Sequence, residues 1–139
     1  MLTDNDRRFL VAVPRLGLLT VDPPPDSWPA PVPVWFDCTD TGVELFSLRG
    51  TPKLEAIERR PYASLMAVNH LDEPEAWVSI AGPAQVEPGG AFELAERLAP
   101  RYWDLSDPAR VRTLASWGRD PDQFVRISIT AEVVRRYGS

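Results

Sequence analysis

The stretch Glu44–Arg60 reads ELFSLRGTPKLEAIERR and joins a strand pattern to a short helix. Its first residues alternate in polarity with period 2, which is typical of a strand with one buried face. Thr51 is a suitable N-cap and Pro52 a suitable first helical residue, while Pro61 ends the helix. Within seven residues of this junction lie four hydrogen-bond donors with no acid among them: Ser47, Arg49, Thr51 and Lys53.

These four side chains match the needs of a phosphate group. A helix N-terminus offers free N–H groups and a partial positive charge. Arg49 can form paired, charge-assisted hydrogen bonds, Lys53 can add a point charge, and Ser47 and Thr51 can donate hydroxyl groups. The alternative interpretation is that Arg49 and Lys53 are surface charges and Thr51 is only a cap.

The pattern on either side of the junction predicts a small antiparallel barrel rather than a doubly wound sheet. Five further strand patterns are separated mostly by turn signals, and short helices are expected at 4–11, after Gly90 and around 111–117. A proline-rich stretch, VDPPPDSWPAP (21–31), is expected to be a stiff hairpin loop. The six predicted strands are 16–21, 32–38, 43–48, 62–69, 76–86 and 124–134.

Length and composition narrow the class of protein. At 139 residues, a single domain over 1–139 is expected. A net charge of -5 disfavours nucleic acid as a partner. Cys38 is the only cysteine and His70 the only histidine, so a disulfide and a transition-metal site both lack residues. The N-terminus offers no membrane span or signal-peptide core, and a cytoplasmic location is expected.

The order and spacing of five segments resemble a known family. These segments are RLGLLTV, PVPVWF, the strand ending in SLRGTPK with its helix and RRPYASLMAV, WVSIAGPAQV, and the closing VRISITAEVV. Together they are similar to the flavin-binding split barrels of the pyridoxamine 5'-phosphate oxidase-like superfamily. The resemblance covers roughly residues 7–103 and the last strand. It implies a mainly β fold, a six-stranded antiparallel split β-barrel with short flanking helices.

The resemblance also implies a cofactor site and a partner. It places the phosphate of FMN on Ser47, Arg49, Thr51 and Lys53, and the isoalloxazine ring along Pro33, Val34 and Trp35. Trp77 would come from the second subunit of a homodimer with its sites at the interface. Members of the family hold FMN, the deazaflavin coenzyme F-420, FAD or haem. Trp35 and Trp77 also fit a simpler interpretation as core or interface aromatics.

The expected function is therefore that of an FMN-dependent oxidoreductase acting on a small organic substrate. Without a Ser-His-Asp arrangement or an acid-base pair, the chemistry is expected to come from the cofactor. The alternatives are an F-420-dependent reductase, a non-catalytic flavin or haem carrier or sensor, in which haem would favour a role for His70, and a dimeric interaction module. Both flavin-type cofactors carry a phosphate on a ribityl chain, so the phosphate pattern fits either.

Overall fold

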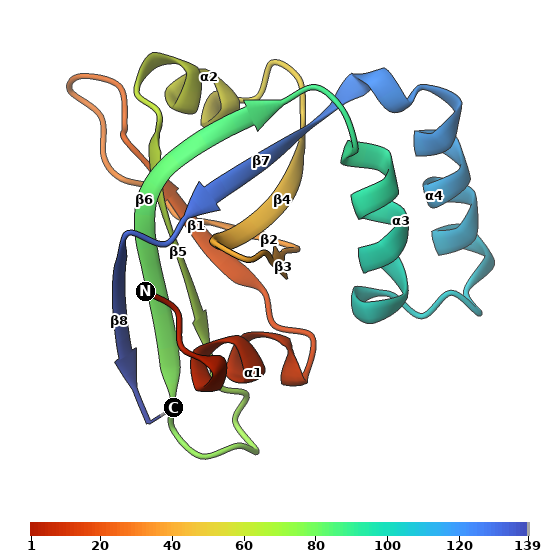
Figure 1. Ribbon diagram of the computed structural model, residues 1–139. Helices are drawn as coiled ribbons and strands as arrows, with labels where there is room; N and C mark the ends of the chain where they lie inside the picture. The colour runs from red at the N-terminus through yellow and green to blue at the C-terminus, as the bar shows by residue number, and fades with distance from the viewer. Residues whose placement is uncertain (139) are drawn as a thin grey trace.

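The computed structural model describes residues 1–138 as a strongly curved antiparallel sheet with four α-helices around it (Figure 1). The strands are β1 (Gly17–Val21), β2 (Val32–Val34), β3 (Asp37–Cys38), β4 (Gly42–Leu48), β5 (Tyr62–Val68), β6 (Trp77–Glu87), β7 (Phe124–Thr130) and β8 (Val133–Tyr137). The helices are α1 (Asp4–Ala12), α2 (Pro52–Arg59), α3 (Ala91–Tyr102) and α4 (Pro108–Arg119), with a 3-10 turn η1 (Pro121–Gln123).

The sheet runs in the order β2-β1-β5-β6-β7-β4-β3, and β8 pairs with β6. Its two edge strands are consecutive in the chain, so the residues Trp35 and Phe36 link one edge to the other. All pairings are antiparallel. The predicted antiparallel split barrel is confirmed.

The number of strands is eight among the described residues, whereas the sequence pattern predicted six. Two of the predicted strands are each broken in two. In the stretch 32–38, the first part is β2, which pairs with β1, and the last part is β3, which pairs with β4. The chain bends between them at Trp35 and Phe36. The stretch 124–134 bends at Ala131 and Glu132, opposite the place where β6 bends at Gly82 and Pro83. A period-2 pattern continues through such bends and does not reveal them.

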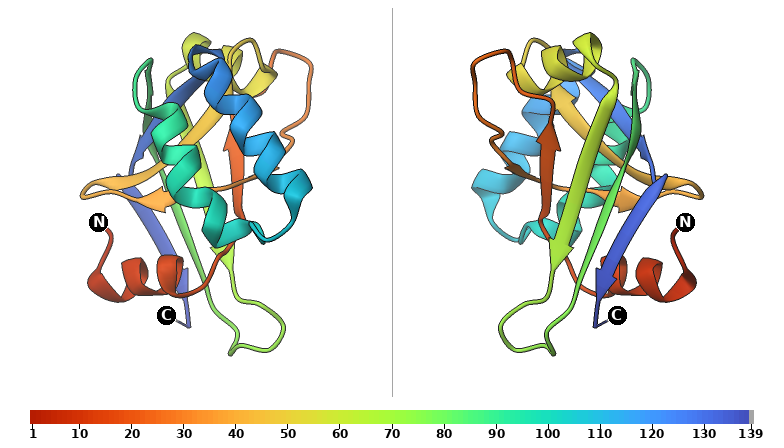
Figure 2. Two further views of the ribbon diagram at one scale, coloured as in Figure 1. Left: turned by 90° about the vertical axis from the view of Figure 1, so that its right-hand side faces the viewer. Right: turned by 90° about the vertical axis from the view of Figure 1, so that its left-hand side faces the viewer.

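The helices cover different parts of the sheet (Figures 1 and 2). Helices α3 and α4 form a hairpin at one side, and α3 packs against β4 and β7. Helix α2 lies beside the proline-rich loop at one end of the sheet, and α1 lies near the other end. The N-cap of α1 is Thr3, whereas Asp4 at the start of the predicted helix is the residue that the sequence pattern favours as a cap: the Thr3 hydroxyl accepts from the Asp6 amide, and the Asp6 carboxylate accepts from the Thr3 amide.

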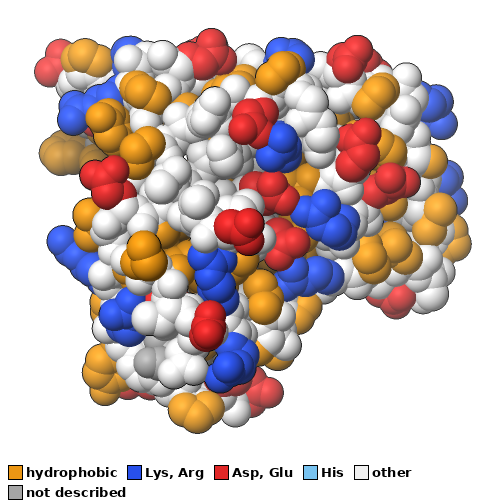
Figure 3. All heavy atoms as spheres, viewed as in Figure 1, with side chains coloured by type: hydrophobic (Ala, Val, Ile, Leu, Met, Phe, Trp, Pro, Cys, Tyr) orange, Lys and Arg blue, Asp and Glu red, His pale blue; other side chains and the backbone are white. Residues whose placement is uncertain are grey.

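Charged side chains of both signs are interspersed on the face shown in Figure 3. Charged side chains also form ion pairs in this structure: Glu44 contacts both Arg97 and Arg126. This face therefore lacks the single-sign basic area that a nucleic-acid backbone requires. Within residues 1–138, no helix has the length and hydrophobicity needed to cross a membrane.

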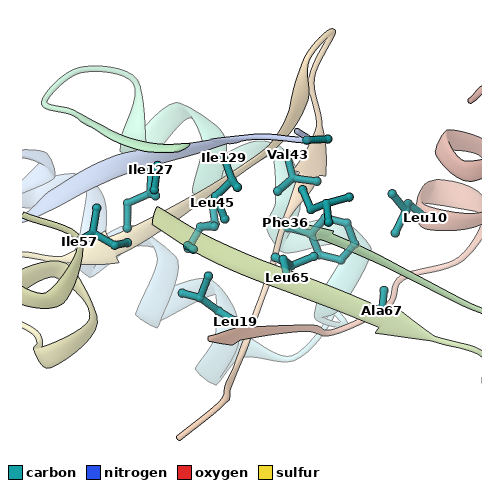
Figure 4. Packing of buried hydrophobic residues seen from close by; sticks show 14 of the residues in the cluster. Leu10, Leu19, Phe36, Val43, Leu45, Ile57, Leu65, Ala67, Ile127 and Ile129 are labelled. Atoms are coloured by element: carbon teal, nitrogen blue, oxygen red, sulfur yellow. The ribbon is translucent and has the colours of Figure 1, made fainter. Parts of the chain in front are cut away.

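The core lies inside the curve of the sheet (Figure 4). Buried side chains from all parts of the sheet and from α1 and α2 meet there, and they include Leu10, Leu19, Phe36, Leu45, Ile57, Leu65 and Ile127. Each such side chain removes apolar surface from water and stabilises the fold by roughly 1.5–3 kcal/mol. Because Leu54 and Ile57 belong to this core, the position of α2 relative to the sheet is fixed, and so is the junction that precedes it.

Candidate functional site

The β4–α2 junction forms a tight turn in which the two predicted hydroxyl groups bond to each other. The Ser47 and Thr51 hydroxyl oxygens are 3.0 Å apart, and each also lies within hydrogen-bonding distance of the Leu48 carbonyl oxygen. Gly50 has a φ of 75°, a left-handed conformation that favours glycine. Thr51 occupies the N-cap position of α2, but its hydroxyl makes no capping bond to the helix. The free N–H groups of the first turn of α2 therefore remain available to a ligand.

Lys53 is the only lysine in the chain; the other fourteen of the fifteen basic residues are arginines. Its side chain is half-buried, and burial lowers the pKa of its ammonium group. Within the described part of the chain, no hydrogen bond or ion pair involves this side chain. A partly desolvated cation without a counter-ion gains free energy from an anionic ligand.

Arg49 is placed differently from Lys53. Its Nε donates to the Asp122 carbonyl oxygen at 2.6 Å, and its backbone N–H donates to the Gln123 carbonyl oxygen at 2.9 Å. The side chain is exposed and ties the β4–α2 junction to the turn η1. Its terminal nitrogens extend beyond this contact, so the geometry leaves donors for an anion at the protein surface.

An apolar groove of about 430 Å³ opens beside the junction. It brings together five of the predicted site residues, which come from β2, the link after it, β4 and α2: Pro33, Val34, Trp35, Ser47 and Lys53. Its other walls include Leu16, Phe46, Trp117 and Phe124. The volume lies within the range of about 300–1,000 Å³ found for small-molecule sites, and the lining combines aromatic rings with a few polar groups.

The aromatic walls are held by packing between the sheet and the helical hairpin. Trp35 stacks on Tyr102 with ring centroids 5.2 Å apart and meets Trp103 edge-on at 4.6 Å. Trp117 lies 5.8 Å from Phe46 and 5.4 Å from Phe124. The Trp35 ring is thus partly committed to packing against α3, as the simpler interpretation of this residue expected, and it also lines the groove.

Trp77 lies away from the other predicted residues within this chain. It begins β6, where it pairs with Val68 and with Tyr137. Figure 1 shows the start of β6 and helix α2 at opposite ends of the sheet. Arg49 and Thr51 also lie outside the groove lining, although both flank the junction. A contribution of Trp77 to the groove of the same chain is therefore excluded by this geometry, whereas one across a subunit interface is compatible with it.

The sequence patterns missed part of the groove. Phe46 and Phe124 were interpreted only as strand residues, and Trp117 only as a residue of the last helix. Trp117 follows Val111 and Leu114 at a spacing of three, and this apolar stripe on α4 could have shown which side of that helix turns towards the sheet.

The fold and the groove together define a class: a split β-barrel with an apolar groove of small-molecule size next to a helix N-terminus that carries a lysine. No protein-family model matches the chain, and no curated protein matches its sequence. Solved structures do match its fold. An F420 reductase aligns with a TM-score of 0.72 and 18% identity, covering 92% of this chain and 94% of its own.

Two further structures give the same result. A conserved hypothetical protein from Mycobacterium tuberculosis has a TM-score of 0.68 and 19% identity, with 99% of this chain and 85% of its own covered. A putative pyridoxamine 5'-phosphate oxidase from Listeria innocua has a TM-score of 0.63 and 21% identity, with 96% and 98% covered. At these identities the likeness shows the fold alone. That fold is the split barrel of the pyridoxamine 5'-phosphate oxidase type.

Proposed function

We propose that the groove binds a flavin and that the protein is a flavin-dependent oxidoreductase acting on a small organic substrate. The observation that carries the proposal is Lys53, a half-buried cation without a counter-ion in the described part of the chain, at the mouth of an aromatic groove. A ribityl phosphate supplies the missing charge, and a flat ring system suits the apolar walls. The chain's similarity in fold to an F420 reductase and to a putative pyridoxamine 5'-phosphate oxidase supports the same conclusion.

Each residue has a defined part in holding the cofactor. Lys53 and the first N–H groups of α2 would bind the phosphate, with the Ser47 and Thr51 hydroxyls turned from each other towards it. Arg49 would reach the same phosphate with its terminal nitrogens while its Nε stays on Asp122. Pro33, Val34 and Trp35 would lie along the ring, and Phe46 and Trp117 would keep water from it.

When bound, the flavin supplies hydride or electron transfer, which the side chains of this groove do not provide by themselves. FMN is the smallest cofactor with the required ring and phosphate. The deazaflavin F-420 is the second candidate, favoured by the fold similarity to an F420 reductase. Activity separates an enzyme from a carrier: an enzyme passes electrons from a reductant through the bound cofactor to an acceptor over many turnovers.

The outer face of the sheet fits a second copy of the chain. Exposed apolar side chains share the outer face of β1, β5 and β8: Leu18, Tyr62, Val68, Val133 and Tyr137. Trp77 lies on this same face, paired with Val68. We infer a homodimer in which Trp77 approaches the partner's groove. The molar mass from multi-angle light scattering tests this inference. The mass of a monomer at micromolar protein concentration would contradict the homodimer.

Selective labelling of Lys53 tests the cofactor site directly. Apart from the N-terminal amine, Lys53 is the only primary amine, so an amine-reactive ester followed by peptide mass spectrometry reports on this one side chain. Bound FMN should protect Lys53 while labelling of the N-terminal amine continues. Equal labelling of Lys53 with and without saturating FMN would remove the phosphate assignment.

Substitution supplies the quantitative test. Lys53→Met keeps most of the length of the side chain and removes its charge, and loss of a charge-assisted contact of about 1.5–3 kcal/mol should weaken FMN binding by about 10- to 150-fold. Lys53→Arg should restore much of the affinity. Arg112→Met is a matched control, because Arg112 is an exposed cation on α4 outside the groove. Equal affinities of the Lys53→Met and Arg112→Met variants would contradict the proposal.

A further inference from the structure

A second cavity of about 320 Å³ lies between α2 and the proline-rich loop at 22–31. Figures 1 and 2 show this loop, in orange, beside α2 in every view. Apolar side chains form most of its lining, among them Val21, Pro23, Trp28, Val32 and Ala56. Lys53 lines this cavity as well as the flavin groove, so one cation lies between the two spaces.

The formal charges of the ionisable side chains that line this cavity sum to zero. These side chains are Asp22, Lys53, Glu55 and Arg59. Arg59 donates to the Asp22 carbonyl oxygen at 3.2 Å, and Arg60 lies 3.8 Å from the Asp22 carboxylate. A ligand group carrying several carboxylates finds two acids here and no excess of cations. An uncharged, flat group finds an apolar wall.

Trp28 makes the loop suitable for such a group. Its side chain is 86% exposed although it lines the cavity, an unusual position for the largest apolar residue. The surrounding prolines fix their φ angles, so the loop is stiff and loses little conformational entropy when a ligand binds. Aromatic side chains of this kind stack on the faces of nucleobases.

We propose that this cavity binds the adenosine part of a flavin dinucleotide, so that FAD rather than FMN is the preferred cofactor. The order of the sites matches the order of the groups in FAD: ring groove, then Lys53 at the first phosphate, then the cavity under Trp28. A reacting substrate is a poorer occupant, because this cavity adjoins the phosphate end of the flavin and not its ring.

This inference rests on the proposed function and is tested by calorimetric titration of the purified chain with FMN, FAD and the deazaflavin. FAD should bind at least about tenfold more tightly than FMN, given the stacking contribution of one base. In the Trp28→Ala variant, FAD and FMN should bind with about equal affinity, and the affinity for FMN should be unchanged. The Trp28→Phe variant should keep most of the preference for FAD. Leu71→Ala, in the exposed loop before β6, is the control.

The outcomes distinguish failure of the FAD inference from failure of the proposed flavin site. Binding of FMN as tight as that of FAD would overturn the inference and leave the flavin site standing. Tighter binding of the deazaflavin than of FAD, insensitive to Trp28→Ala, would also overturn it. Absence of binding of all three cofactors would refute the proposed function itself. Because the ratio of FAD to FMN affinity is measured on the unaltered chain, the test does not depend on the folding of a variant.

Discussion

Replacing Asp6 by Asn should measurably destabilise the fold through one ion pair. The Asp6 carboxylate is fully buried and accepts from the Nε and Nη2 atoms of Arg136 on β8, both at 2.8 Å, and from the Thr3 amide at 2.9 Å. This contact joins the start of α1 to one of the last residues of the chain. The hydrogen bond from Arg136 is the main reason that the pKa of Asp6 lies below its ordinary value.

The magnitude follows from these three hydrogen bonds. Asn keeps one acceptor oxygen, loses the charge and turns an NH₂ group towards the donors of Arg136. Hydrogen bonds to charged groups contribute about 1.5–3 kcal/mol each. Arg136 is 39% exposed and can turn to water, so the cost stays below that of breaking a fully buried pair. We expect a loss of about 2–3 kcal/mol, which lowers the Tm by about 6–12 °C.

Urea unfolding at pH 7 and again between pH 4 and 2 is the assay. Because the folded-state pKa of Asp6 is lowered, its contribution is complete above the ordinary value of about 3.9 and is lost as the pH falls through the folded-state value. The difference between the unaltered chain and the Asp6→Asn variant should therefore shrink in acid. Asp4→Asn, at an exposed position of the same helical turn, is the control. A loss below about 0.5 kcal/mol at pH 7 would show that the ion pair between Asp6 and Arg136 does not stabilise the fold.

Two further outcomes are expected. A Cβ at Gly82 would lie 2.0 Å from the Thr130 carbonyl oxygen, so Gly82→Ala should cost about 1–3 kcal/mol in urea unfolding, whereas Gly89→Ala, with open space around it, should cost less than about 0.5 kcal/mol; equal costs would show that the two strands can separate freely at the bend. Burial raises the pKa of the Cys38 thiol to about 11, so iodoacetamide should react with it at pH 8 far more slowly than with the unfolded chain; equal rates would contradict this.

Sequence patterns predicted the positions of individual strands and helices well, but they did not predict the bends that divide two of the strands. The alternation in Val43–Leu48 and the helix signals from Thr51 to Pro61 led to β4 and α2 with almost the same limits. The bends at Trp35 and at Ala131 depend on which strand lies alongside, and no local pattern records a neighbour.

Some residues of the candidate site could likewise be predicted from the sequence, and others could not. The residues proposed to bind a phosphate could be picked out because they are close together in the sequence and because a helix N-terminus gives a physical reason for anion binding. Phe46 and Trp117 are far apart in the sequence and meet only because α4 folds back on the sheet. Trp28 was part of a loop that the sequence marked as stiff, yet its position over a cavity next to Lys53 required the packing of α2.

The most direct test of the central claim is retention of a flavin through gel filtration, with riboflavin as the comparison. FMN and riboflavin share the ring and the ribityl chain and differ only in the phosphate that Lys53 and the start of α2 are proposed to bind. The visible flavin absorbance of the protein fraction should show FMN retained at close to one molecule per chain and riboflavin largely lost. Loss of both, or equal retention of the two, would contradict the assignment of the β4–α2 junction as a phosphate site.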